Sequence, residues 1–255
     1  KAKEDIYSSI DGSLMFEKDS VITTENSGAI VNTGSEVGNG IYALSLDGHL
    51  DISNLPMSTK GASYYLQEVK TLDGCVLDTA QYDAVFKQSD FTTKNYIKSF
   101  DVENKTTDFE FNKTDVTGDK EVEGAQLTIT DEDGNVVDQW TSDGKVHSIE
   151  GLVVGKTYTL SETVTAKDYV KATDIKFTVK NSSELETVTM KDKQVFVSKT
   201  TVGGEEVTGA HMQIIDEDGN IIDEWYSEGK SHIANGLEEG KTYTLHEDLY
   251  PLGFN

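Results

Sequence analysis

Residues 113–162 read KTDVTGDKEVEGAQLTITDEDGNVVDQWTSDGKVHSIEGLVVGKTYTLSE, and residues 199–247 read KTTVGGEEVTGAHMQIIDEDGNIIDEWYSEGKSHIANGLEEGKTYTLHE. The second stretch repeats the first with an offset of 85 residues at three matched pairs: Asp131 and Asp216, Trp140 and Trp225, Glu162 and Glu247. A repeat of this length predicts a chain built from similar structural units that follow one another.

A more distant copy lies upstream, because YYLQEVKTLDGCVLD around Glu68 resembles YTLSETVTAKDYVKA around Glu162. We therefore expect units of about 85–95 residues, at 1–107, 108–193 and 194–255. The first unit is expected to lack its N-terminal strand and the last unit its C-terminal strands. The chain is accordingly interpreted as a fragment of a longer protein.

The pattern inside a unit is typical of β-strands. Segments 125–130, 135–140, 156–162 and 174–180 alternate apolar and polar residues, and turn clusters such as DEDGN and SDGK separate them. DGN between alternating segments indicates a hairpin, because its glycine accommodates a positive φ. The sequence therefore predicts an all-β protein of tandem antiparallel sandwiches. The connectors ENKTTD and KDKQ contain no Gly/Pro/Ser run, which favours a stiff, elongated array.

Charge and composition exclude several classes of function. The chain has 46 acidic residues against 22 basic ones, all of them lysine, and a net charge of −24. This charge repels nucleic acid and disfavours binding to anionic lipid. The sequence contains no apolar run near the roughly 20 residues of a membrane helix, so no membrane insertion is expected. The single cysteine, Cys75, excludes an internal disulfide framework and a multi-cysteine metal site.

Three ionisable residues continue apolar stripes of strands, because residues i, i+2 and i+4 share a face. The stripes are Phe109–Phe111–Lys113, Tyr158–Leu160–Glu162 and Val188–Met190–Asp192. Related stripes end at Lys199 and Glu247 in the last unit, after Val195 and Val197 and after Tyr243 and Leu245. In the first unit they end at Glu68 and Asn104, after Tyr64 and Leu66 and after Phe100 and Val102.

A lone buried charge is very unfavourable, so these groups are expected to be paired or neutral. Desolvation lowers the pKa of a lysine and raises that of a carboxyl group. A neutral amine held against a carboxylic acid can condense with it to an amide and release water. Two alternatives remain open from the stripes alone: a buried cluster held only by ion pairs, or strand ends that leave each group solvated. The recurrence of both lysine and glutamate favours a specific role.

FNKTD, YTLSET and VTMKD resemble the B-type repeats of Gram-positive collagen adhesins and pilins, the Cna-B or SpaA-like family. The resemblance implies prealbumin-like (Ig-like) β-sandwiches with autocatalytic intramolecular isopeptide bonds. It makes Lys113 the amine, Asp192 the acceptor and Glu162 the catalytic carboxyl. The family's YxLxET box is followed by APxGY, whereas SETVTAKDY here keeps Glu162 and Tyr169 but lacks the proline and the glycine.

Only the middle unit is expected to hold a complete set of these groups. The last unit has Lys199 and the carboxyl Glu247, and its acceptor is expected beyond the chain. In the first unit, Glu68 is the matching carboxyl and Asn104 the candidate acceptor, while the lysine strand is expected before Lys1.

Weaker motifs are given structural interpretations. DEDGN is interpreted as a hairpin turn rather than a calcium loop, since it is too short for an EF-hand. The five histidines show no metal-ligand spacing, so neither a metal site nor a cofactor is expected. Trp140 and Trp225 are assigned to packing. Cys75, where the family has tyrosine, is also assigned to packing, with a reactive thiol as the alternative.

The resemblance implies a structural stalk or shaft segment of an extracellular, cell-wall-anchored adhesin or pilin. Its chemistry would be single-turnover self-crosslinking, so it is not an enzyme that turns over substrate. Expected partners are other domains of the same protein, host matrix or other pilin subunits, and sortase through a motif outside the sequence. A YPK-like polymerisation lysine is absent, which favours an adhesin stalk. The alternatives are a module binding host matrix or glycan, through the first unit, and accessory repeats of an extracellular enzyme.

Overall fold

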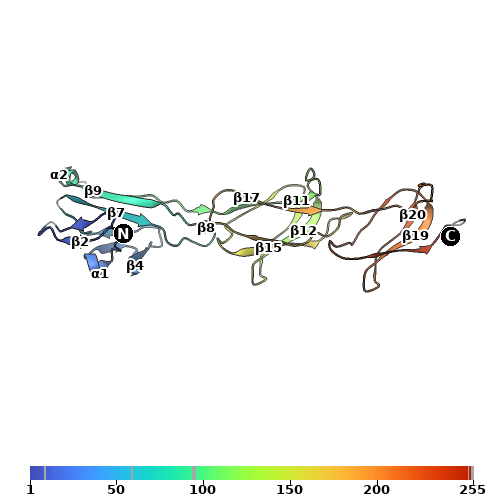
Figure 1. Cartoon of the computed structure of the whole chain (residues 1–255), viewed down its shortest axis with the longest axis horizontal. Helices are drawn as coiled ribbons and strands as arrows, with labels where there is room; N and C mark the ends of the chain where they lie inside the picture. The colour runs from blue at the N-terminus through green and yellow to red at the C-terminus, as the bar shows by residue number, and fades with distance from the viewer. Residues whose placement is uncertain (9, 59, 94–95, 252, 254–255) are drawn as a thin grey trace. The chain divides into compact units, whose positions relative to one another are not determined.

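The computed structural model describes every residue except 9, 59, 94–95, 252 and 254–255 (Figure 1). The described residues are nearly all in strands and loops, which confirms the predicted all-β class. The two short helices in this part of the chain are α1 (Thr24–Ser27) and α2 (Gln88–Thr93). Neither of these helices has the length and apolar character needed to cross a lipid bilayer.

The chain divides into two compact units. The first comprises Lys1–Thr71 and Leu77–Asn104, and the second comprises Leu72–Val76 and Lys105–Asn255. The second unit contains two sandwiches, which we call the middle sandwich (residues 108–192) and the last sandwich (residues 196–249). Domain boundaries near 107 and 194 stay a prediction.

In its described residues, the first unit has four small antiparallel sheets with the pairings β1–β2, β3–β6, β4–β5 and β7–β9. Their bounds are β1 Ile6–Tyr7, β2 Leu14–Phe16, β3 Ile30–Thr33, β4 Ser35–Gly38, β5 Ile41–Ala43, β6 Asp51–Ser53, β7 Gly61–Gln67 and β9 Gln81–Lys87. Its core gathers Ile6, Phe16, Tyr64 and Phe86 around the buried Ala2.

The middle sandwich packs a three-stranded sheet, β14-β11-β17, against a four-stranded sheet, β13-β12-β15-β16. The bounds are β11 Asp108–Asp115, β12 Glu123–Thr130, β13 Val136–Asp143, β14 His147–Glu150, β15 Thr157–Val164, β16 Ile175–Thr178 and β17 Glu186–Asp192. The first and last strands, β11 and β17, are parallel neighbours. Phe111 and Met190 from one sheet meet Leu127 and Leu160 from the other in a buried core.

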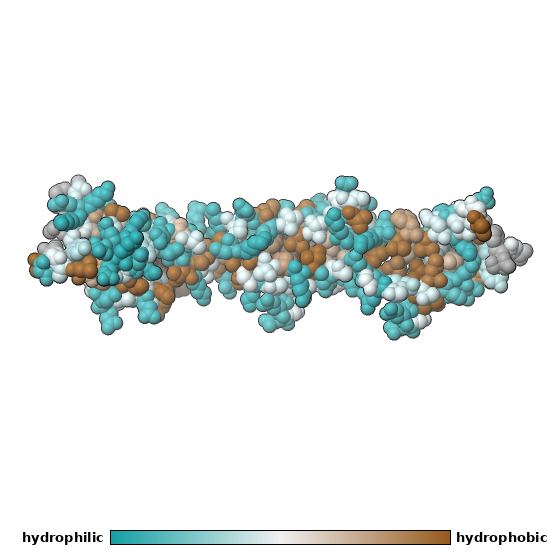
Figure 2. All heavy atoms as spheres, in the orientation of Figure 1, coloured by the Kyte–Doolittle hydropathy of each residue, from teal (hydrophilic) through white to brown (hydrophobic). Residues whose placement is uncertain are grey.

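The last sandwich repeats part of this plan. Its sheets are β20-β19-β22 and β18-β21, with bounds β18 Phe196–Val197, β19 Thr208–Ile215, β20 Ile221–Glu228, β21 His232–Ile233 and β22 Thr244–Leu249. Within the described residues, no strand pairs with β18 in the way that β17 pairs with β11. Figure 2 shows apolar surface over this sandwich, where Phe196 and Leu245 are 59% and 51% exposed.

The second unit also includes β8 (Cys75–Val76), which pairs with β10 (Lys105–Thr106). Gly74 precedes β8 with a φ of +81°, and a Cβ there would lie 2.5 Å from the carbonyl oxygen of Gly151. The positive φ and this close approach both require glycine at this position.

Candidate functional site

The three ionisable residues of the middle sandwich come from three strands. Lys113 lies on β11, Asp192 on the parallel strand β17, and Glu162 on β15 of the opposite sheet. In the parallel register Lys113 is opposite Met190, so Asp192 follows two residues later on the same face. All three side chains therefore point into the space between the sheets.

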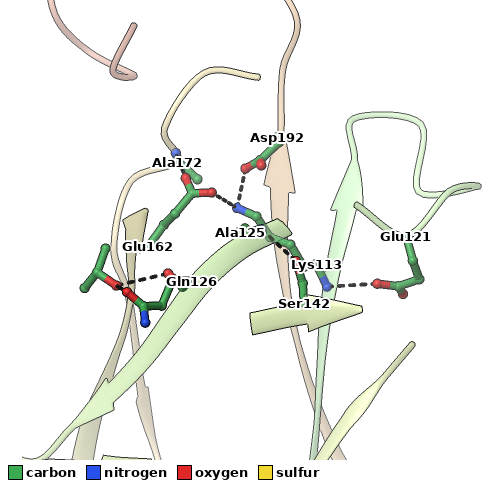
Figure 3. A network of polar contacts seen from close by, with 9 residues as sticks. Lys113, Glu121, Ala125, Gln126, Ser142, Glu162, Ala172 and Asp192 are labelled. Carbon is green, nitrogen blue, oxygen red and sulfur yellow. Dashed lines mark hydrogen bonds and ion pairs between the residues drawn. The ribbon is translucent and has the colours of Figure 1, made fainter. Parts of the chain in front are cut away.

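The three groups are buried and in contact (Figure 3). Lys113 is 2% exposed, and Glu162 and Asp192 are each 1% exposed. Lys113 Nζ donates a hydrogen bond to Asp192 Oδ1 and lies 3.0 Å from Glu162 Oε1. The structure thus confirms that all three stripes continue into the core, and it brings their last residues together.

A backbone group fixes the orientation of Glu162. The N–H of Ala172 donates to Glu162 Oε2 at 2.9 Å, which leaves Oε1 directed at the lysine (Figure 3). Ala172 belongs to the loop after β15, and the sequence patterns gave no signal for this contact. The N–H of Lys113 donates to Glu121 Oε2 at 3.1 Å, which holds the lysine backbone at the edge of the site.

Burial sets the protonation of this site. Desolvation raises the pKa of Asp192 from 3.8 to about 6, against the opposing effect of Lys113 and with a further increase from Glu162. Asp192 Oδ2 has no hydrogen-bond partner within the described part of the chain. One lysine facing two carboxyl groups leaves an unmatched negative charge, and holding a proton on one carboxyl removes it. The site therefore favours Asp192 as a neutral carboxylic acid.

The last sandwich keeps half of this arrangement. Lys199 Nζ donates to Glu247 Oε2 at 2.7 Å, with side chains 29% and 25% exposed. Among the described residues, no second carboxyl group is paired with Lys199. Glu247 Oε1 is buried and has no hydrogen-bond partner in this part of the structure.

The expected stripes of the first unit are wrong. Leu66 is 41% exposed, and Glu68, which is only half-buried, accepts a hydrogen bond from the N–H of Asp78. Asn104 is exposed and lies outside the strands, as does Val102. Residues 96–104 form no strand, so the i, i+2, i+4 alternation has no sheet face to occupy there. The role of Asn104 as an acceptor stays a prediction.

The two DEDGN segments form hydrogen-bonded turns. Asp131 Oδ1 accepts from the N–H groups of Asp133 and Asn135 and closes the β12–β13 hairpin, and Asp216 does the same with Asp218 and Asn220. These contacts confirm the interpretation of DEDGN as a turn.

The tryptophans stack on histidines. Trp140 packs against the middle core and lies on His147 with ring centroids 4.0 Å apart, and Trp225 lies on His232 in the same way. Both histidines also contact an aspartate, Asp138 or Asp223.

Residues 107–194 match the model of the SpaA prealbumin-like fold domain. This segment belongs to that family. The match spans β11 to β17 and contains Lys113, Glu162 and Asp192. The matched segment also contains the loop that departs from the APxGY pattern, because Asp168 stands before Tyr169 where that pattern has glycine. Asp168 adopts a φ of +68°, a left-handed conformation that glycine adopts freely and that aspartate tolerates better than most residues.

Several solved structures are similar over longer stretches. The Bacillus anthracis TIE protein is 21% identical, with 84% of this chain and 41% of that chain covered and a TM-score of 0.36. This chain therefore spans less than half of that protein's length. The streptococcal ancillary pilin is 18% identical (83% and 72% covered, TM-score 0.33), and the shaft pilin SpaA of Lactobacillus rhamnosus GG is 16% identical (58% and 90% covered, TM-score 0.30). No curated protein sequence matches the chain.

Proposed function

We propose that this chain is a structural stalk segment of a bacterial surface protein, either a pilin shaft or an adhesin stalk. Its middle sandwich would be closed by an isopeptide bond between Lys113 and Asp192. The observation that carries this proposal is the buried contact of Lys113 with two carboxyl groups, one of which is held by a backbone N–H. The SpaA-type fold of residues 107–194 supports the same role.

The proposed reaction is a condensation that needs no cofactor. Lys113 Nζ passes one proton to Glu162 and then, as a neutral amine, attacks the carboxyl carbon of protonated Asp192 and forms the C–N bond. Glu162 delivers this proton to the departing hydroxyl, the C–O bond breaks and water leaves, and Glu162 then accepts the extra proton of the nitrogen. The raised pKa of Asp192 favours the acid form that this step uses. The reaction occurs once per chain, so it is self-modification rather than turnover.

The strand order gives this bond a mechanical effect. Lys113 and Asp192 are 79 residues apart in sequence but lie on the adjacent parallel strands β11 and β17. A force that enters the middle sandwich through β11 and leaves after β17 would pass through the bond. The intervening residues would carry no load, and the sheets would not have to separate.

The proposed setting is the outside of a Gram-positive cell. The segment would be attached to the cell wall by sortase acting on a motif outside these 255 residues. Its partners would be neighbouring domains, other pilin subunits or host matrix. The acidic, lysine-only charge composition suits an exposed shaft that stays soluble.

The intact mass of the denatured chain tests the reaction. We expect the wild type to be lighter than its sequence mass by one water, and Glu162→Gln, which keeps the side-chain shape, to have the full mass. Lys199→Ala is the matched control, because it changes the equivalent lysine of the last sandwich and should keep the deficit of one water. A wild type of full mass would leave only a buried ion cluster and would overturn the proposal.

A further inference from the structure

The loop that orients Glu162 also contacts the last sandwich. We call residues 166–172 the seam segment. Within it, the N–H of Lys171 donates to the carbonyl oxygen of Leu237 at 2.8 Å, and the carbonyl oxygen of Lys171 accepts from the N–H of Glu239 at 2.9 Å. These two hydrogen bonds are a short parallel pairing between Lys171 and Glu238. Lys171, which precedes Ala172, is therefore hydrogen-bonded to the last sandwich.

The side chains of the seam segment are divided between the two cores. Val170 is buried in the last sandwich with Ile214, Ala234 and Leu237. Ala172, two residues later, is buried in the core of the middle sandwich. Moving either core relative to the other would shift the seam segment between them.

From Asp168 to Ala172, each backbone N–H of the seam segment is directed to a partner. Asp168 donates to Asn235 Oδ1 of the last sandwich at 2.8 Å, Tyr169 to the carbonyl oxygen of Ala166, and Val170 to that of Lys193. After Lys171, whose N–H goes to the last sandwich, Ala172 donates to Glu162. The hydrogen bond from Ala172 to Glu162 is thus the last of a series of backbone hydrogen bonds, and other members of that series join the seam segment to the last sandwich.

From this series we propose that docking of the last sandwich on the seam segment positions Glu162 for the condensation. Crosslinking of the middle sandwich then depends on the folded sandwich that follows it. Asn235 and the backbone N–H of Glu239 are positioning groups, since they act through Ala172 and touch no reacting atom. This inference rests on the proposed function, because it concerns the rate of the same reaction.

One substitution removes the hydrogen bond from the Glu239 N–H to the Lys171 carbonyl oxygen with little disturbance elsewhere. Glu239 is the second residue of a turn in which the N–H of Lys241 donates to the carbonyl oxygen of Glu238. Proline is favoured at this turn position and lacks an N–H, so Glu239→Pro removes the donor to Lys171. Glu239→Gln is the matched control, because it keeps the N–H and changes only the side chain that pairs with Lys193. Asn235→Ala is a second variant, which removes the acceptor for Asp168.

The full chain is synthesised in a cell-free reaction and quenched at intervals, and the fraction that has lost one water is measured. We expect Glu239→Pro and Asn235→Ala to slow water loss about tenfold, the effect of a misplaced proton-transfer group, while Glu239→Gln follows the wild type. Hydrogen exchange at the Ala172 N–H should quicken in the first two variants only. Trp225 fluorescence verifies that the last sandwich is folded in each.

The outcomes separate the two proposals. A wild type that never loses water overturns the crosslink and this inference together. Equal rates of water loss in the wild type, Glu239→Pro and Asn235→Ala, with the last sandwich folded, overturn the inference alone. A slowed reaction with unchanged exchange at Ala172 also contradicts it, because the effect would then not act through the Glu162 contact.

Discussion

The middle and last sandwiches contain the same lysine–glutamate pair in different surroundings. Lys113 and Glu162 have side chains 2% and 0% exposed, whereas Lys199 and Glu247 are 29% and 25% exposed. In the middle sandwich β17 lies beside β11 and supplies the second carboxyl, Asp192. The comparison shows that the lysine and glutamate alone form an ordinary ion pair. We propose that an acceptor on a covering strand, which also excludes water, is what makes such a pair reactive.

The largest difference between the sandwiches should be in stability. An amide between residues 79 apart should stabilise the middle sandwich by roughly 4 kcal/mol, by analogy with the loop entropy of a disulfide. Glu162→Gln should lose this contribution, while Glu247→Gln, which breaks a partly exposed ion pair, should lose less than about 1 kcal/mol. Denaturant unfolding is followed by Trp140 in a Trp225→Phe background and by Trp225 in a Trp140→Phe background. Equal losses in the two sandwiches would break the comparison.

A smaller effect concerns pH. In Glu162→Gln the proposed bond should not form, so Asp192 should stay a free carboxyl. Burial raises the pKa of this carboxyl above 3.8, to about 6 in the wild-type site. Between these values the folded state holds a proton that the unfolded chain has released. The free energy of unfolding of the middle sandwich should therefore decrease as pH rises from about 4 to about 6, by up to about 3 kcal/mol. Adding Asp192→Asn should abolish this slope; a slope that persists would assign it to another group.

The smallest effect should be the same in both sandwiches. Asn135 Nδ2 donates to Asp131 Oδ2 at 2.9 Å, and Asn220 makes the same contact with Asp216 at 2.9 Å. Because both bonds are exposed, Asn135→Ala and Asn220→Ala should each lower the free energy of unfolding by about 0.5 kcal/mol. The same tryptophan backgrounds report the two values. Clearly different losses in the free energy of unfolding would show that the two sandwiches also differ outside their lysine–glutamate pairs.

The sequence predicted the fold class and the burial of Lys113, Glu162 and Asp192, because the alternation in β11, β15 and β17 coincides with real sheet faces. The same alternation misled where a covering element is missing among the described residues. Leu160 is fully buried, since β15 pairs with β16 and packs on the opposite sheet, whereas its repeat partner Leu245 on β22 is 51% exposed. Local periodicity defines a face but not what covers it. At Asn104 the alternation failed for another reason, because residues 96–104 form no strand.

The contacts of the seam segment could not be predicted from sequence patterns, for a different reason. Its contacts with Glu162 and with the last sandwich are made largely by backbone N–H and carbonyl groups of a loop. Backbone groups are the same at every position, so no residue type marks them.

The most direct test of the account is to locate the lost water by tryptic peptide mapping of the denatured chain. If Lys113 is acylated, trypsin cannot cut after it, and residues 106–120 should remain joined to residues 192–193 as one branched peptide lighter by one water. Lys199 should be cleaved normally in the same digest. Separate peptides ending at Lys113 and Lys193, or a link from Lys113 to the peptide of Glu162, would contradict the assignment of Asp192 as the acceptor.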